Sequence, residues 1–286
     1  MRWRDGRRSD NIEDRRGSGM GGPVRIGGLG LIATVVIAWL MGANPSQIFG
    51  LVADNILGGG GSSNVNTAYQ ETGVEREQAE FVSVVMASTE DIWNPIFQEA
   101  NAQYQEPKLV LFKDQTSSAC GMSSSATGPF YCPGDRKVYI DLGFFNELRQ
   151  MGASGEFARA YVIGHEVGHH VQNLLGITTQ ISRMQNQSSQ RDSNALSVLL
   201  ELQADCFAGV WANQAQRKFN ILEQGDIEAG LQAAASIGDD RLQRMSGRAV
   251  NPDRFTHGSS EQRVQWFKTG LQYGDMNRCN TFASAR

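Results

Sequence analysis

Two histidines four residues apart constrain this chain more than any other feature. Residues 165 to 169 read His-Glu-Val-Gly-His, inside an apolar run that extends from 161 to 171. An α-helix has 3.6 residues per turn, so His165 and His169 would lie on one face, one turn apart. Two imidazoles in this arrangement can bind one Zn²⁺, and Glu166 beside them can accept a proton from a metal-bound water. The motif predicts a zinc-binding helix that still needs a third protein ligand.

A second apolar segment supplies a candidate for that ligand. Residues 197–211 carry Glu201 and Asp205 four residues apart, and the segment is apolar nearly all round, which predicts a buried helix. A buried carboxylate without a partner is costly, so a metal ion or a metal-bound histidine is expected beside it. We predict that Glu201 completes a His₂Glu set for one zinc ion and leaves one position for water. Asp205 would then accept the free ring N–H of a ligating histidine. The alternative is that both acids pair with arginines such as Arg183 or Arg191.

The N-terminal residues differ in charge from the rest of the chain. Residues 1–25 are rich in arginine and have a net charge of +3, whereas the remainder carries 19 basic and 26 acidic residues. A negatively charged body argues against a nucleic-acid-binding protein. The length of 286 residues leaves room for one domain of about 200 residues with appendages.

An uncharged stretch follows this tail, from 26 to 53. Its first part, 26–43, is mostly apolar and as a helix would span roughly 27 Å, close to the thickness of a bilayer core. We predict an uncleaved transmembrane anchor there, with the tail 1–25 in the cytosol and the chain after the anchor across the membrane. A cleavable signal peptide is the alternative, but cleavage after neither Ala43 nor Gly42 would leave a small residue at the −3 position.

The chain beyond the anchor divides into a linker and a domain. Residues 44–74 contain the run GGGGSS and have no helical periodicity, which is typical of a flexible linker. The domain, 75–286, starts with a helical pattern that continues to Phe97. Strand-like runs follow at 108–113 and 137–142, separated by a Ser/Gly-rich loop at 114–127 and a turn at 128–135.

The rest of the domain has helical periodicity. Helices are expected near 143–151, 155–175, 190–218, 225–237 and 259–273. A few strands followed by a helical body predict the α+β class, with a small antiparallel or mixed sheet.

Four cysteines lie in this domain, and none forms a C-x-x-C pair. An even number in an exported domain predicts two disulfides, although the sequence leaves three pairings open. We expect Cys120–Cys132, which closes a short loop, and Cys206–Cys279, which ties the C-terminus to a core helix. Four buried thiols are the alternative.

These motifs resemble those of the bacterial membrane-anchored neutral zinc metallopeptidases, the YpfJ-like family. The resemblance runs from the Arg-Trp-Arg opening to the Cys-Asn-Thr-Phe ending. The core also resembles gluzincins of the CAAX prenyl and HtpX types, whose Glu-x-x-x-Asp-x-x-Ala motif matches Glu201, Asp205 and Ala208. The resemblance implies a zincin-like fold and peptide hydrolysis by a zinc-activated water with Glu166 as general base.

Further roles follow from the same resemblance. His257 and Arg263 stand where those proteases have a later His-Pro…Arg element, with Gly258 in place of the proline. His257 is expected to stabilise an oxyanion or orient substrate, and Arg263 to brace the site; the alternative is a surface histidine and a salt bridge at a helix N-terminus. Gly168 would let another segment approach the zinc helix closely. His170 is expected to be packed in the core or to lie at the edge of the substrate site.

The strand 137–142 precedes the zinc helix, where zincins have an edge strand. By resemblance, Val138, Tyr139 and Ile140 would bind an extended peptide through main-chain hydrogen bonds. We therefore predict a zinc endopeptidase of the bacterial inner membrane, with its N-terminus cytosolic and its catalytic domain periplasmic or extracellular. Its partners would be a peptide or protein substrate and the membrane. A non-catalytic zinc protein that organises envelope partners and a zinc amidase acting on a cell-wall fragment remain alternatives, although Glu166 favours catalysis.

Overall fold

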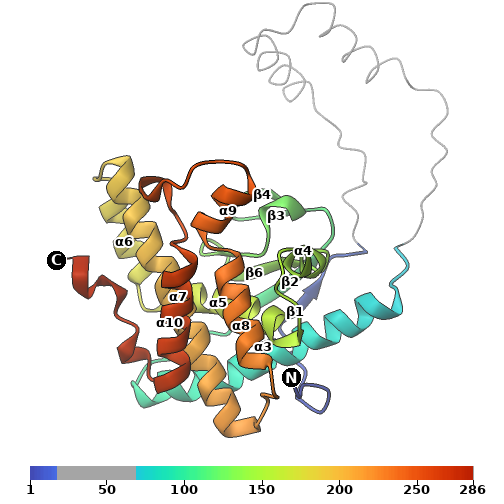
Figure 1. The fold of residues 1–286 in the computed structure, drawn as a ribbon. Coiled ribbons are helices and arrows are strands. Elements are labelled where there is room, and N and C mark those ends of the chain that lie inside the picture. The colour runs from blue at the N-terminus through green and yellow to red at the C-terminus, as the bar shows by residue number, and fades with distance from the viewer. Residues whose placement is uncertain (18–68, 286) are drawn as a thin grey trace, which may run out of the picture. The chain divides into compact units, whose positions relative to one another are not determined.

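The structure is a computed structural model, and it describes residues 1–17 and 69–285 (Figure 1). Met1–Arg16 and Glu71–Arg286 form one unit, which contains every helix and strand discussed below. The predicted anchor, 26–43, and most of the predicted linker, 44–74, lie outside the described residues.

A four-stranded mixed sheet lies on one side of this unit (Figure 1). Its strands, in spatial order, are β1 (Ile12–Asp14), β2 (Lys108–Phe112), β6 (Lys137–Asp141) and β5 (Phe130–Cys132). Strands β1, β2 and β6 are parallel, whereas β5 is antiparallel to β6. A separate hairpin consists of β3 (Gln115–Ser118) and β4 (Gly121–Ser124). The residues predicted to form a loop and a turn between the two expected strands thus contain three short strands.

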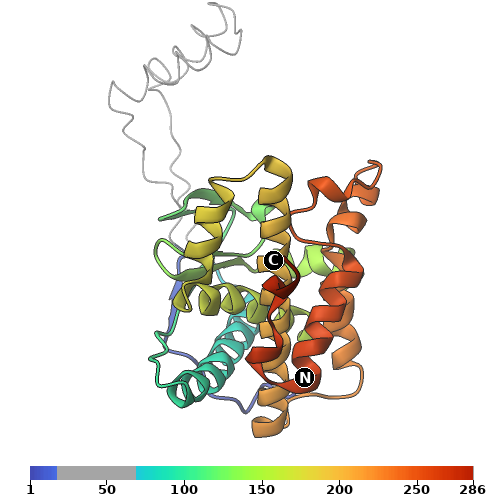
Figure 2. The same cartoon turned by 90° about the vertical axis from the view of Figure 1, so that its left-hand side faces the viewer.

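Helices make up the rest of the unit. In chain order they are α3 (Gly73–Glu99), α4 (Phe144–Gln150), α5 (Glu156–Leu174), α6 (Ile177–Gln185), α7 (Gln190–Phe219), α8 (Asp226–Ser236), α9 (Asp239–Met245) and α10 (Ser260–Tyr273). The predicted α+β class is confirmed; α6 and α9 are additional to the helices expected from the sequence. Helix α5 packs on α7 and α8 and also contacts β5 and β6, so it lies between the helical body and the sheet (Figures 1 and 2).

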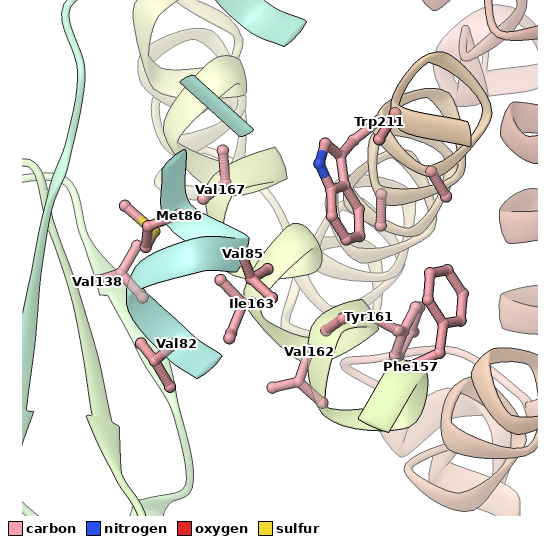
Figure 3. Close-up of a cluster of buried hydrophobic side chains, with 14 of the residues drawn as sticks. Val82, Val85, Met86, Val138, Phe157, Tyr161, Val162, Ile163, Val167 and Trp211 are labelled. Atoms are coloured by element: carbon pink, nitrogen blue, oxygen red, sulfur yellow. The ribbon is translucent and has the colours of Figure 1, made fainter. Parts of the chain in front are cut away.

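The core is centred on α5. Figure 3 shows Ile163 and Val167 of this helix beside Val85 and Met86 of α3, with Trp211 of α7 nearby; all five side chains are fully buried. Burying a side chain of this size contributes about 1.5–3 kcal/mol. The His-Glu-x-x-His motif is therefore carried by a helix whose apolar side chains are buried against α3 and α7, which fixes its position.

Gly168 allows α7 to come close to α5, as predicted. A Cβ at this position would lie 2.8 Å from the carbonyl oxygen of Ala204, so a larger residue would push the two helices apart. Because Glu201 is less than one turn from Ala204, this close approach brings its carboxylate to the histidines.

Strand β6 is not an edge strand, which corrects the predicted peptide-binding role of Val138, Tyr139 and Ile140. It pairs with β2 on one side and with β5 on the other, and these three residues are fully buried. The reason is that the chain folds back after the hairpin and adds β5 outside β6. In the part of the chain that the structure describes, β5 is the edge strand of this end of the sheet.

The arginine-rich tail is part of the folded unit, although a separate tail was predicted. The Met1 ammonium binds the carboxylate of Glu223 at 2.8 Å and that of Asp226 at 3.1 Å. The buried indole of Trp3 donates to Glu156 at 2.8 Å. Most of the positive charge of the tail is paired with acids of the domain, as for Arg7 with Glu90 and Asp91 of α3.

This arrangement contradicts the placement of tail and domain on opposite sides of a membrane. Strand β1, which belongs to the tail, pairs with β2 from Ile12↔Leu109 to Asp14↔Leu111. Arg16 and Glu71 form an ion pair of 2.8 Å. Strands that share hydrogen bonds must share a compartment, so a single crossing between Arg16 and Glu71 is incompatible with this fold.

Two other predictions can be assessed from the same unit. The disulfides Cys120–Cys132 and Cys206–Cys279 are both present, which confirms the expected pairing. Among the described residues, α7 is the helix that is long and apolar enough to cross a membrane, but 67% of its apolar window is buried inside the unit. Such burial is typical of a core helix.

Candidate active site

Three predicted metal ligands meet where α5 and α7 are in contact. His165 and His169 lie on one face of α5, and Glu201 faces them from α7. The Nε2 atoms of the two histidines are 3.2 Å apart. The Glu201 carboxylate lies 3.2 Å from Nε2 of His165 and 3.4 Å from Nε2 of His169. Ligand atoms held 2.0–2.1 Å from a tetrahedral zinc lie about 3.3 Å from one another, so the spacing fits this metal.

The other ring nitrogen of each histidine has an acceptor of its own. Nδ1 of His165 lies 2.8 Å from Oδ1 of Asp205, and Nδ1 of His169 lies 2.9 Å from Oε1 of Gln172. Both contacts favour the tautomer in which Nδ1 carries the proton and Nε2 offers its lone pair to a metal. Three protein ligands with this support leave a fourth position for water, which is typical of catalytic rather than structural zinc sites.

Asp205 is the centre of a buried charged network. Arg263 of α10 donates to both of its oxygens, at 2.8 and 2.9 Å, and the Tyr161 hydroxyl donates to it as well. Burial acts to raise the pKa of Asp205, but the charges of Arg263 and His165 outweigh it and lower that pKa. Asp205 is therefore an anion that holds His165 in place.

The alternative pairing of these acids with Arg183 or Arg191 does not occur. Arg191 pairs with Asp253 at 3.1 Å, and Asp205 pairs with Arg263, which is 1% exposed. Arg263 therefore braces the site from the inside, and it is not part of a surface salt bridge.

Glu166 lies beside the three ligands and lines the same cavity. Its side chain is buried, and burial raises its pKa even though His165 and His169 act to lower it. A carboxylate with a raised pKa is a stronger base than an exposed one, which suits a group that takes a proton from water near neutral pH.

A cavity of about 520 Å³ opens over the triad and Glu166. One wall is the segment from Thr127 to Tyr131, which includes most of the edge strand β5. The remaining walls are mainly apolar: Phe144, Val162, Leu200, Ile237 and Leu242. The triad and Glu166 thus line a mainly apolar pocket beside β5, the edge strand at this end of the sheet in the described part of the chain.

The comparison with known proteins agrees with this geometry. The model of the family described as "Putative neutral zinc metallopeptidase" matches residues 1–282. The chain belongs to this zinc metallopeptidase family.

Two similar proteins match most or all of the chain. The uncharacterised protein YpfJ of Escherichia coli K12 is 46% identical, with full coverage of both chains. An uncharacterised protein of Mycobacterium tuberculosis H37Rv is 43% identical over 69% of this chain and 68% of its own length. No solved structure matches the chain significantly.

In this family member, His257 reaches the cavity from the segment before α10. Its Nδ1 lies 3.2 Å from Oδ1 of Asp239. The hydrogen bond to Asp239 therefore involves Nδ1 and not Nε2, and the residue lines the cavity. The hydrogen bond to Asp239 raises the pKa of His257; burial acts against this shift, and the charge of Glu201 adds to it. His257 thus lines the cavity together with the triad of His165, His169 and Glu201, and its side chain is half exposed.

The sequence analysis missed three residues that lie around this candidate site. Tyr161 and Gln172 lie on α5, four residues before His165 and three after His169. Helical spacing puts them on the ligand face, so periodicity gave a signal for both. Tyr131 lies on β5, and no sequence signal identified that strand.

Proposed function

We propose that this protein is a zinc-dependent endopeptidase. The observation that carries the proposal is the triad of His165, His169 and Glu201, whose three donor atoms are spaced as the corners of one face of a zinc tetrahedron. A purely structural site would ordinarily be closed by a fourth protein ligand, and it would not need the buried base Glu166. Both features favour catalysis over the alternative of a non-catalytic zinc protein.

The residues around the triad have complementary roles in this proposal. Zinc, when bound by the triad, supplies a Lewis acid that polarises the scissile carbonyl and lowers the pKa of water. Glu166 removes a proton from the attacking water and later delivers it to the leaving amine. His257, in its protonated form, donates from Nε2 to the negative charge that develops on the carbonyl oxygen. Asp205 and Gln172 hold the two histidines in the required tautomer.

The substrate in this proposal is an extended peptide on the free edge of β5. A strand edge offers unpaired main-chain donors and acceptors, which an added peptide strand can satisfy. This assignment transfers to β5 the role that the sequence had suggested for β6. The apolar walls of the cavity favour a substrate with apolar side chains near the cleaved bond.

The cell envelope is the proposed location. Two disulfides support an oxidising compartment, and the apolar run 26–43 supports attachment to the bacterial inner membrane. Because residues 1–16 belong to the catalytic unit, we propose that they lie on the same side of the membrane as the rest of that unit.

A peptide library tests the proposed reaction. The purified protein should cleave library members with zinc and lose this activity with a chelator. Glu166→Gln should retain one zinc per chain but lower the rate by about 10²- to 10⁴-fold. Glu201→Ala should lose both zinc and activity.

Other outcomes would select the alternatives. Zinc binding with no cleavage of any peptide would favour an organising protein of the envelope. Cleavage of peptidoglycan fragments and not of peptides would favour an amidase. Full turnover by Glu166→Gln would refute its role as base, and full zinc occupancy in Glu201→Ala would move the third ligand elsewhere.

A further inference from the structure

We infer that Tyr131 is a positioning residue, which His170 and Asn173 hold so that the edge strand β5 keeps a fixed place beside the zinc triad. The inference rests on the proposed peptidase function and assigns a role to three residues that the reaction itself does not use. His170 and Asn173 belong to α5, the same helix that carries His165 and His169.

Strand alternation turns Tyr131 toward α5. Its neighbours Phe130 and Cys132 pack on the opposite face of the sheet, where Phe130 stacks on Tyr139 with ring centroids 4.8 Å apart. The Tyr131 ring contacts His170 instead, with ring centroids 5.4 Å apart. Both Phe130 and Tyr131 line the cavity above the triad. Tyr131 thus connects the strand proposed to bind substrate with the helix that carries the zinc ligands.

The hydrogen bonds of His170 have a defined direction. Its Nε2 lies 2.5 Å from the carbonyl oxygen of Gln105, which can only accept, so Nε2 must carry the proton. The ring is fully buried, and its two hydrogen-bond partners are a carbonyl and a phenol rather than an anion, so the proton on Nε2 is the one it carries and Nδ1 is an acceptor. The Tyr131 hydroxyl, 3.0 Å away, therefore donates to Nδ1 of His170.

The same hydroxyl also accepts a hydrogen bond. Nδ2 of Asn173 lies 2.9 Å from it and can only donate. The single proton of the Tyr131 phenol is thus used by His170, and none is left for a substrate oxygen. This excludes Tyr131 as an oxyanion donor in this arrangement and makes its contribution one of position.

Strand β5 is held at two of its three residues. Cys132 links it to Cys120, next to the β3–β4 hairpin, while Tyr131 links it to α5. Loss of the Tyr131 hydroxyl would free the strand from the helix but leave the triad and Glu166 unchanged. A peptide that pairs with β5 would then bind less tightly, whereas the bond-breaking step would keep its rate.

The test compares Tyr131→Phe with a matched control, Tyr139→Phe. Tyr139 lies on the neighbouring strand, and its hydroxyl donates to Asp135 at 2.7 Å on the far side of the sheet. For a peptide long enough to pair along β5, Tyr131→Phe should raise KM about five- to tenfold, as expected for the loss of one or two hydrogen bonds, with kcat within about twofold. Tyr139→Phe should leave both constants unchanged, and both variants should keep one zinc per chain.

Two further measurements separate position from other roles. A short substrate that spans only the cleaved bond should show no change in KM with Tyr131→Phe. Asn173→Leu should raise KM for the long peptide, and the double variant should be no worse than Tyr131→Phe alone, because both act through one hydroxyl.

Each outcome decides the inference. An unchanged KM for the long peptide would overturn it while leaving the peptidase function in place. An equal fall of kcat on long and short substrates would make Tyr131 a catalytic residue instead. If the wild-type protein cleaves no peptide at all, the proposed function fails, and the inference fails with it.

Discussion

The two histidines of the candidate metal site are held by surroundings of opposite character. His165 is supported by an anion, Asp205, which is itself paired with the buried cation Arg263. His169 is supported by the neutral amide of Gln172, whose own N–H groups donate to the carbonyl of Leu200 at 2.7 Å and to Gln203 at 3.1 Å. One half of the site thus depends on buried charges, and the other on a relay of neutral hydrogen bonds.

The difference affects the basicity of each histidine and the tolerance of each half of the site to substitution. Burial acts to lower the pKa of His165, but the charge and hydrogen bond of Asp205 raise it to about 10. The carboxylate partner therefore increases the basicity of His165, whereas an amide partner such as Gln172 does not have this effect. The same charges are costly to separate, because removing one leaves the other buried without a partner. We therefore expect a substitution in the charged half to cost much more stability and zinc affinity than a substitution in the neutral half.

The largest effect should come from Asp205→Ala. It leaves Arg263 unpaired in the core and His165 without its acceptor, so stability should fall by about 3–5 kcal/mol and zinc affinity by about 10- to 100-fold. Denaturant unfolding and metal competition would measure these losses. As a control, Asp205→Leu combined with Arg263→Met should be more stable than Asp205→Ala, since no charge is left unpaired. Equal stability of the two variants would argue against a charged network.

A smaller effect is expected in the neutral half. Gln172→Met removes the acceptor of His169 but leaves no buried charge, so zinc affinity should fall by about tenfold, the low end for such partners. The free energy of unfolding should fall by no more than about 1–3 kcal/mol, which is the penalty for leaving neutral buried groups without a hydrogen bond. The same assays apply. If Gln172→Met proved as damaging as Asp205→Ala, the contrast between the two halves would be lost.

The pH dependence of the reaction tests His257 at the rim of the cavity. Its raised pKa means that the protonated donor is fully present below its ordinary value and is lost as the pH rises through the raised value. The rate, as kcat/KM, should therefore fall on the alkaline side. Asp239→Asn removes the charge that sustains the shift and should move this fall to lower pH. His257→Gln should abolish it; an unchanged alkaline limb in His257→Gln would assign that limb to another group.

The smallest effect is expected from Tyr161→Phe. This change removes one hydrogen bond to Asp205, while both bonds from Arg263 remain. Stability should fall by about 1 kcal/mol, and zinc affinity should change by less than about threefold. A large loss of zinc would show that the tyrosine, and not only the arginine, sets the charge state of Asp205.

Local periodicity was sufficient to predict the centre of the site. His165, His169, Glu201 and Asp205 are each one helical turn from their pair, and this spacing fixes a shared face wherever the helix lies. The expected cysteine pairing was also correct, aided by the short separation of Cys120 and Cys132, although the sequence left three pairings open. Such inferences succeed because they depend on residues close in the chain or on a buried acid that requires a partner.

The tertiary structure decided the features that depend on the order of strands and on distant contacts. Whether β5 or β6 forms the edge of the sheet depends on where the chain returns after the β3–β4 hairpin, and a three-residue strand has too little pattern to reveal it. The union of the N-terminal tail with the domain depends on ion pairs and a β1–β2 ladder between residues far apart in sequence. Helical geometry, which is legible in the sequence alone, thus determined how the predicted metal ligands are grouped on each helix, while long-range packing determined which residues surround them.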